Sequence, residues 1–175
     1  AVTVLVDASS SMRHRPDGEQ TLIEQANVCA LAFAKGLEKS RVATEVIYYG
    51  ENDDDNFLAY TAKSFDQTCI PNNFAVQARG PSTPTGEAMS FALNNLVLRR
   101  EKRKLFILLT DGDPDSKQSV LRAREIAQAF HIAVVPIGIG TDVVKGFENG
   151  EFVTINDPSQ LTNALKEAVR SRLFN

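Results

Sequence analysis

The chain has 175 residues, of which 43% are hydrophobic and 23% are charged, and its net charge at pH 7 is -3. This composition is typical of a globular protein, and the length fits one domain with one core. The slight acidic excess argues against a general binder of nucleic acid or anionic membranes, and no apolar run approaches the roughly 20 residues that cross a bilayer.

The only cysteines are Cys29 and Cys69. Cys29 lies on the apolar stripe of a predicted helix, where a free thiol packs as a small hydrophobe. Two distant cysteines do not make a disulfide framework, so we expect a reduced protein in the cytoplasm. The chain begins directly in a predicted strand at Ala1. We therefore expect residues 1–175 to be a single domain, cut from a longer chain or forming most of one.

The first elements form a strand, a helix and a hairpin. A nearly continuous apolar run at 2–6 predicts a central strand buried on both faces. Residues 19–38 carry apolar side chains at helical spacing and predict a long amphipathic helix. Residues 41–50 and 57–65 predict two strands joined by the polar turn "ENDDDN" at 51–56. Strand, turn and strand together indicate an antiparallel hairpin at one edge of a sheet.

The second half alternates helices and strands after an irregular segment at 66–84. The predicted elements are a helix with its apolar face from Ala88 to Leu96, a strand at 104–112, a helix at 116–130, strands at 132–140 and 151–157, and a closing helix after an Asp157 N-cap, with Leu161, Leu165, Ala168 and Val169 inward. Such alternation predicts βαβ units. The expected fold is a doubly wound, Rossmann-like α/β sandwich of three layers, whose mostly parallel sheet has one antiparallel edge strand.

Three polar loops follow this pattern at one edge of the predicted sheet. In doubly wound sheets, ligands bind outside the carboxyl ends of the strands, where the strand order reverses. The first loop, "DASSS" (7–11), follows the first strand. The second, "STPTGEAM" (82–89), leads into a helix, and the third, "TDGD" (110–113), follows the most apolar strand. We expect the three loops to meet.

The side chains in these loops offer hydroxyl and carboxylate oxygens, without a set of histidine or cysteine ligands. Oxygen donors suit hard cations such as Mg²⁺, Mn²⁺ and Ca²⁺. Hydroxyl ligands are neutral, so a bound cation keeps much of its charge and attracts another anion, most simply a carboxylate of a partner protein. The pattern therefore indicates a site that binds rather than one that catalyses.

The three loops resemble the metal-ion-dependent adhesion site of the von Willebrand factor A domain family, and the chain resembles that family from end to end. The family motif is Asp-x-Ser-x-Ser after the first strand, a Thr in the second loop and an Asp after the fourth strand. "TPTG" (83–86) fits the Thr-x-x-Gly that commonly enters the helix, which favours Thr83 over the other candidate, Thr85. The resemblance implies these metal ligands: Asp7, Ser9, Ser11, Thr83 and Asp111.

The C-terminal half resembles a particular group within that family, the A domain at the end of cobaltochelatase subunit T. The segments that carry this resemblance are "RREKRKLFILLTDGDPD", "VPIGIGTDV", "FVTINDPSQLTNAL" and "RLF". Those subunits work beside a MoxR-type AAA+ ATPase during cobalt insertion into a corrin ring. The resemblance implies a non-catalytic subunit with a partner of that ATPase class.

A purely structural role and an enzymatic role are the alternatives to this interpretation. Ser and Asp are also favoured in loops that cap helices, and the fold could act as a scaffold without metal. A strand ending in Asp7 is also similar to aspartyl phosphatases that use Mg²⁺, although these need a second Asp where this chain has Ser9. Asp113 is predicted to cap a helix that begins at Pro114, and Glu87 to complement a helix dipole.

Overall fold

The computed structural model describes residues 1–16, 18–52, 56–160 and 163. Its centre is a six-stranded sheet with the order β3-β2-β1-β4-β5-β6. The strands are β1 (Val2–Asp7), β2 (Thr44–Glu51), β3 (Phe57–Lys63), β4 (Leu105–Thr110), β5 (Ala133–Ile139) and β6 (Val153–Ile155). All neighbouring pairs are parallel except β2 and β3, which are antiparallel. The predicted sheet and its antiparallel edge strand are confirmed.

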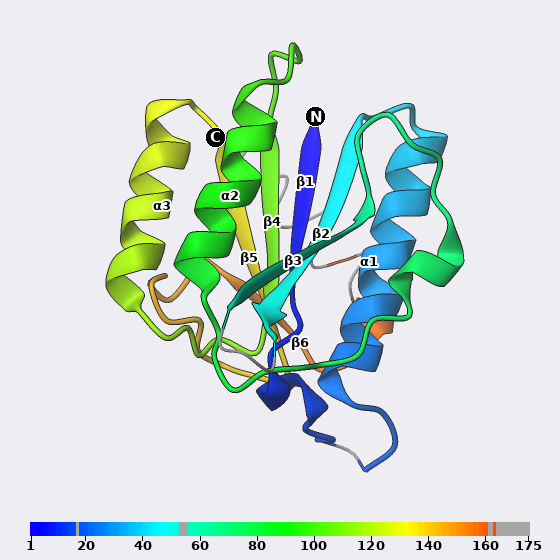
Figure 1. The fold of residues 1–175 in the computed structure, drawn as a ribbon, viewed down its shortest axis with the longest axis vertical. Helices are drawn as coiled ribbons and strands as arrows, with labels where there is room; N and C mark the ends of the chain where they lie inside the picture. Colours follow the sequence, from blue (N-terminus) through cyan, green and yellow to red (C-terminus); the bar gives the residue numbers. More distant parts are fainter. Residues whose placement is uncertain (17, 53–55, 161–162, 164–175) are drawn as a thin grey trace.

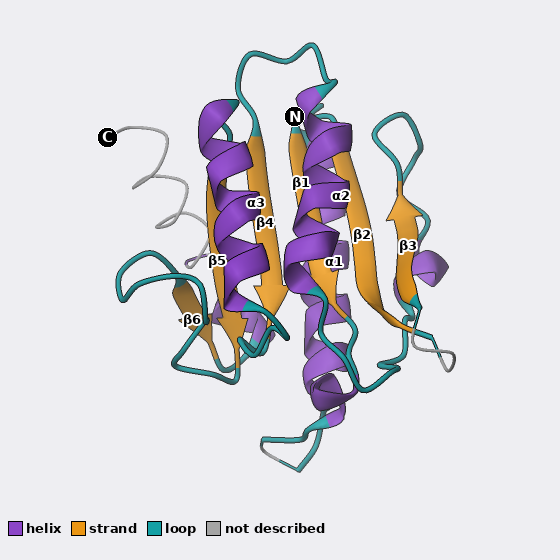
Figure 2. Cartoon of the chain, turned by 60° about the vertical axis from the view of Figure 1, so that its left-hand side comes forward, coloured by secondary structure: helices purple, strands orange, loops and turns teal. Residues whose placement is uncertain are grey.

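Helices cover both faces of this sheet. The helices are α1 (Leu22–Lys39), α2 (Thr85–Val97) and α3 (Lys117–Ala129), with short 3₁₀ turns η1 (Ser10–Arg13), η2 (Pro71–Phe74) and η3 (Pro158–Gln160). Figure 1 shows α1 on one face and the neighbours α2 and α3 on the other. In Figure 2, β3 and β6 lie at the two edges of the sheet. These are the three layers that the alternating pattern predicts.

The central strands are mostly apolar because both of their faces are buried. In β1, Val4 and Val6 belong to the core under α1, whereas Leu5 belongs to the core under α2 and α3. All three side chains are 0% exposed. A strand buried on both faces loses the alternation of polar and apolar residues, which is why the run at 2–6 is informative.

The strand order reverses at β1, and this positions the functional loops. Helix α1 leads from β1 to β2 on one side, whereas α3 leads from β4 to β5 on the other side and on the opposite face. The loops after β1 and β4 therefore diverge at the carboxyl edge of the sheet, which is the lower edge in Figure 1. A crevice at such a point is the usual ligand site of this architecture.

Two predicted helix boundaries need correction. Helix α1 begins at Leu22 rather than at residue 19, because Thr21 and Glu24 form a capping box. The prediction that Asp113 caps a helix from Pro114 is wrong: Ser116 caps α3 by accepting a hydrogen bond from the Ser119 N–H at 3.2 Å.

Asp113 instead forms an ion pair with Lys145, from the loop after β5. The acidic residue in the first turn of α2 is Glu87, as predicted. Near the end of the chain, the Asp157 carboxylate accepts a hydrogen bond from the Ser159 N–H at 2.6 Å, where η3 begins. The predicted inward face of the closing helix lies outside the described residues.

Candidate metal site

Asp7 is the last residue of β1, and its carboxylate is held by two donors. Its side chain is 0% exposed. One oxygen accepts a hydrogen bond from the Ser9 N–H at 2.9 Å, and the other accepts one from the Thr110 hydroxyl at 2.9 Å. The Thr110 hydroxyl in turn accepts the Gly112 N–H at 3.0 Å. Both oxygens keep a further lone pair, so the carboxylate is fixed in place and can still accept a bond from a bound water or ion.

The two serine hydroxyls of the first loop lie together. Ser9 Oγ and Ser11 Oγ are 3.0 Å apart and share a hydrogen bond. Ser9 is 1% exposed, whereas Ser11, in the short turn η1, is exposed. The pair therefore extends from the protein interior to solvent and offers two neutral oxygens at the mouth of the crevice.

Asp111 follows β4 and has an unsatisfied oxygen. Its Oδ1 is buried and has no hydrogen-bond partner among the described residues. A buried carboxylate oxygen without a partner is costly. Burial, and after it the charge of Asp111, raise the pKa of Asp7 to about 6. The two carboxyl groups thus lie close enough to repel each other, and a cation between them would offset both costs.

The two candidate threonines differ in what their hydroxyls contact. The Thr85 hydroxyl is hydrogen-bonded to the Tyr49 hydroxyl at 2.9 Å, and it contacts the Thr83 carbonyl oxygen at 3.4 Å. The backbone N–H of Thr83 donates to both carboxylate oxygens of Asp115 at 2.8 Å. Its hydroxyl forms no hydrogen bond within the described part of the chain. Thr83 is therefore the threonine whose hydroxyl is available for a ligand.

Hydrogen bonds connect the three loops and the residues that flank them. In the first loop, the Ser10 N–H donates to the carbonyl oxygen of Gly80, two residues before the second loop, at 3.0 Å. Thr110 joins the first loop to the third through Asp7. The N–H of Asp115, two residues after the third loop, donates to the Thr83 carbonyl oxygen of the second loop at 3.0 Å. The loops that the sequence predicts to meet are therefore brought to one edge and tied together.

The third loop depends on a glycine. Gly112 has a φ of 95°, and a Cβ there would lie 2.0 Å from the Val143 carbonyl oxygen. Only glycine adopts this backbone freely, and no side chain fits against Val143. The loop that carries Asp111 is thus held tightly against the segment after β5.

Two residues that contribute to the site were missed from the sequence. Thr110 donates to Asp7, and Tyr49 positions Thr85. Thr110 was visible as a hydroxyl at the end of a buried strand, directly before a candidate ligand. Tyr49 gave no comparable signal, because an aromatic residue in a strand is ordinary core composition.

The donors in this site are oxygens, and most of them are neutral. No group of three or more His, Cys, Asp or Glu that could hold a metal occurs in the part of the chain that the structure describes. The three loops offer hydroxyl and carboxylate oxygens, a donor set that suits a hard divalent cation. Ser9 stands two residues after Asp7, where an aspartyl phosphatase needs a second acid, so the arrangement favours binding over phosphoryl transfer.

The comparison with protein families agrees with this fold. The model of the von Willebrand factor type A domain matches residues 1–168, so the chain belongs to that family. Collagen alpha-1(XXI) chain of Xenopus laevis is 37% identical over 71 residues, which are 39% of this chain and 7% of the collagen. This chain therefore spans a small part of that relative.

Solved structures of the same fold include a mussel byssus protein and a bacterial protein. Proximal thread matrix protein 1 of the mussel byssus superposes with a TM-score of 0.72 at 20% identity, covering 96% of this chain and 46% of that one. Another structure of that protein, with a TM-score of 0.69 at 18% identity over the same shares of the two chains, is described as having a zinc-occupied metal-ion-dependent adhesion site. A conserved hypothetical protein, BatB from Bacteroides thetaiotaomicron, gives 0.71 at 15% identity and covers 99% of this chain and 98% of its own.

Proposed function

We propose that this domain binds a divalent cation through the three loops and uses it to capture a carboxylate of a partner protein. The proposed direct ligands are the hydroxyls of Ser9, Ser11 and Thr83, with Asp7 and Asp111 acting partly through water. The observation that carries the proposal is the buried Oδ1 of Asp111, which has no partner among the residues that the structure describes, beside the buried carboxylate of Asp7. Cation binding would stabilise both charges.

The neutral ligands explain why the site would seek a partner. Three hydroxyls contribute no charge, so the cation keeps much of its positive charge and attracts a further anion. The carboxylate of a partner's Asp or Glu binds the cation at the exposed side of the site, next to Ser11. No chemical step is required of the protein, so we propose a non-catalytic binding role.

Mg²⁺ is the cation that we propose, with Mn²⁺ and Ca²⁺ as the other hard candidates. The zinc-occupied site was described for the mussel protein, and it does not set the cation that we propose for this chain. Competition among Mg²⁺, Mn²⁺, Ca²⁺ and Zn²⁺ by calorimetry on protein freed of metal by chelation would rank them. Binding of Zn²⁺ alone would contradict the preference for hard cations.

Calorimetric titration also tests the ligand set, and the two threonines provide a matched pair. Thr83→Val should weaken cation binding at least about tenfold, since a ligand is lost. Thr85→Val should leave the affinity within about twofold, because the Thr85 hydroxyl already pairs with Tyr49. The reverse order of effects would assign the ligand to Thr85. Cation affinities equal to that of the parent protein in both threonine variants and in Ser9→Ala would contradict the site itself.

The setting that we propose is an assembly with a MoxR-type AAA+ ATPase, as in the cobaltochelatase subunits. The support is the resemblance of the C-terminal half, and the two free thiols of Cys29 and Cys69 agree with a cytoplasmic location. An ATPase of that class encoded beside this gene should co-purify with the domain in Mg²⁺ and dissociate in chelator. Co-purification that chelator and Asp7→Ala leave unchanged would contradict capture through the metal.

A further inference from the structure

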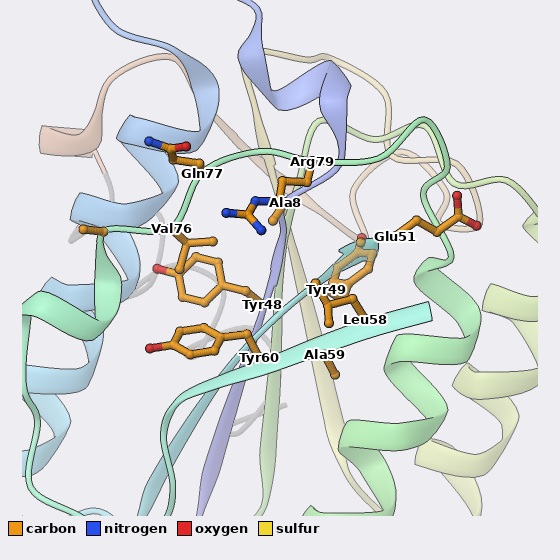
Figure 3. A pocket seen from close by; sticks show the side chains of 12 residues that line it. Ala8, Tyr48, Tyr49, Glu51, Leu58, Ala59, Tyr60, Val76, Gln77 and Arg79 are labelled. Carbon is orange, nitrogen blue, oxygen red and sulfur yellow. The ribbon is translucent and has the colours of Figure 1, made fainter. Parts of the chain in front are cut away.

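A cavity of about 480 Å³ lies beside the first loop, between the hairpin and the segment that precedes α2. Its floor is formed by Tyr48, Leu58 and Tyr60 of β2 and β3, and its wall by Val76, Gln77 and Arg79. Figure 3 shows the two tyrosine rings side by side on the hairpin, with the wall segment passing over them. This volume accommodates one or two large side chains of a ligand.

The floor is aromatic and partly open to solvent. The rings of Tyr48 and Tyr60 have their centroids 6.4 Å apart and are tilted by 43°. Tyr48 is 1% exposed, whereas Leu58 and Tyr60 are 42% and 43% exposed. Large apolar side chains gathered in an open hollow are typical of an interaction site. An aromatic or branched aliphatic side chain of a ligand would cover them.

The wall adds an unneutralised cation. The guanidinium of Arg79 forms no ion pair or hydrogen bond with any of the described residues. In Figure 3 it points from the wall toward the space above Tyr48, whereas Glu51 points away from it. Guanidinium groups recognise carboxylates through paired hydrogen bonds. The complementary ligand therefore combines an apolar side chain with a carboxylate.

The cavity borders the first loop of the candidate metal site. Ala8, which stands between Asp7 and Ser9, is part of its lining. The Arg79 N–H donates to the Ala8 carbonyl oxygen at 2.7 Å. Arg13 of η1 donates through Nε and Nη2 to the Ala78 carbonyl oxygen at 3.1 and 3.0 Å. The wall of the cavity and the first metal loop are thus joined by hydrogen bonds, so a ligand in the cavity would lie next to that loop.

We propose that this cavity is a second binding site for the same partner, specific for an acidic peptide segment that also carries a large apolar side chain. One acid of that segment binds the cation, its apolar side chain lies on Tyr48 and Tyr60, and a further carboxylate pairs with Arg79. The identity of the occupant as the metal-bound partner rests on the proposed function. The binding chemistry of the cavity does not, and it is testable without any metal.

The first experiment uses 3-phenylpropionate as the probe on ¹⁵N-labelled protein in EDTA. Saturable shifts are expected at the amides of Gly50, Ala59 and Val76, with at least fivefold weaker binding in Arg79→Gln and for 3-phenylpropan-1-ol. Arg41→Gln is the matched control and should change nothing, because Arg41 follows α1, away from the cavity. Equal binding of the acid and the alcohol, or shifts confined to other elements, would overturn the proposal.

The second experiment joins the two sites. In a set of Gly/Ser peptides with one Asp and one Phe at varied spacing, one spacing should bind in Mn²⁺ at least tenfold tighter than the peptide with Asp alone. Tyr60→Ala should remove this gain and leave the binding of the Asp-only peptide unchanged. Equal affinity at every spacing would overturn the joint site while leaving metal capture intact. Cation-independent binding of all peptides would contradict the proposed function, and the phenylpropionate result would still decide the cavity.

Discussion

At the scale of single residues, the molecule buries two kinds of acid. Asp7 and Asp111 lie beside each other at the edge of the sheet, where a cation would neutralise their repulsion. Glu45 of β2 is 5% exposed and lies far from those loops, with one oxygen bonded to Asn95 at 3.2 Å and the other without a partner among the described residues. The first kind is placed to bind a cation, whereas burial of the second lowers the stability of the folded protein when Glu45 is ionised.

Removal of the Asp111 charge should separate stability from cation binding. Asp111→Asn removes the repulsion that helps to raise the pKa of Asp7. The metal-free variant should therefore be more stable than the parent by about 1 kcal/mol at pH 7, and it should lose most of its cation affinity. Urea denaturation in EDTA and calorimetry with Mg²⁺ measure the two effects. Lower stability together with unchanged affinity would contradict the role of Asp111.

Glu45 makes stability depend on pH in a direction that its pKa fixes. Burial raises this pKa to about 7, from an ordinary value of 4.5. The folded state therefore holds the proton more tightly, and the stability gained from the neutral acid is complete below pH 4.5 and lost as the pH rises through 7. The loss is at most about 3 kcal/mol.

Glu45→Gln mimics the neutral acid and should flatten this dependence. In EDTA, the free energy of unfolding of the parent should fall between pH 5 and pH 8 by about 2 kcal/mol more than that of the variant. Urea denaturation at the two pH values measures the difference. Parallel losses in both proteins would show that Glu45 ionises normally.

At the scale of elements, close helix packing positions the second loop. Helices α2 and α3 lie side by side on one face. Gly86, in the first turn of α2, lies directly against the backbone of α3. A Cβ at Gly86 would lie 2.3 Å from the Ser119 Cβ and 2.7 Å from the Val120 backbone nitrogen. The entry of α2, directly after Thr83, therefore depends on the absence of a side chain.

Gly86→Ala and Gly36→Ala form a matched pair of helical substitutions. The first should destabilise the protein by about 2–3 kcal/mol, because the two helices must separate. The second should stabilise it by about 0.5–1 kcal/mol, since a Cβ at Gly36 of α1 meets nothing within 4 Å and alanine favours a helix. Thermal denaturation measures both. A stabilising Gly86→Ala would contradict the close approach.

The elements that could be predicted are those whose signals are local. The strands β1 and β4 are nearly continuous apolar runs because both faces are buried, and the turn between β2 and β3 is marked by consecutive polar residues. The cap of α3 was wrongly assigned to Asp113 because the actual partner of Asp113, Lys145, is 32 residues away. Long-range pairs of this kind leave no periodic trace in the sequence.

At the scale of the whole molecule, the candidate site is assembled because the topology places three distant loops at one edge. Residue types and strand order predicted which loops would meet. They left Thr83 and Thr85 open, because the choice depends on Tyr49, which reaches Thr85 from another strand. The cavity beside Arg79 could not be predicted, since its wall is an irregular segment whose path is set by bonds to Ala8 and Arg13.

The most direct test of the account is a diffraction measurement on crystals soaked in Mn²⁺, with data collected for anomalous scattering. A single strong peak is expected within coordination distance of the Ser9, Ser11 and Thr83 hydroxyls, with the carboxyl groups of Asp7 and Asp111 facing it directly or through water. A peak elsewhere, or no peak at saturating Mn²⁺ with the two carboxyl groups turned away from each other, would contradict a cation site in these loops.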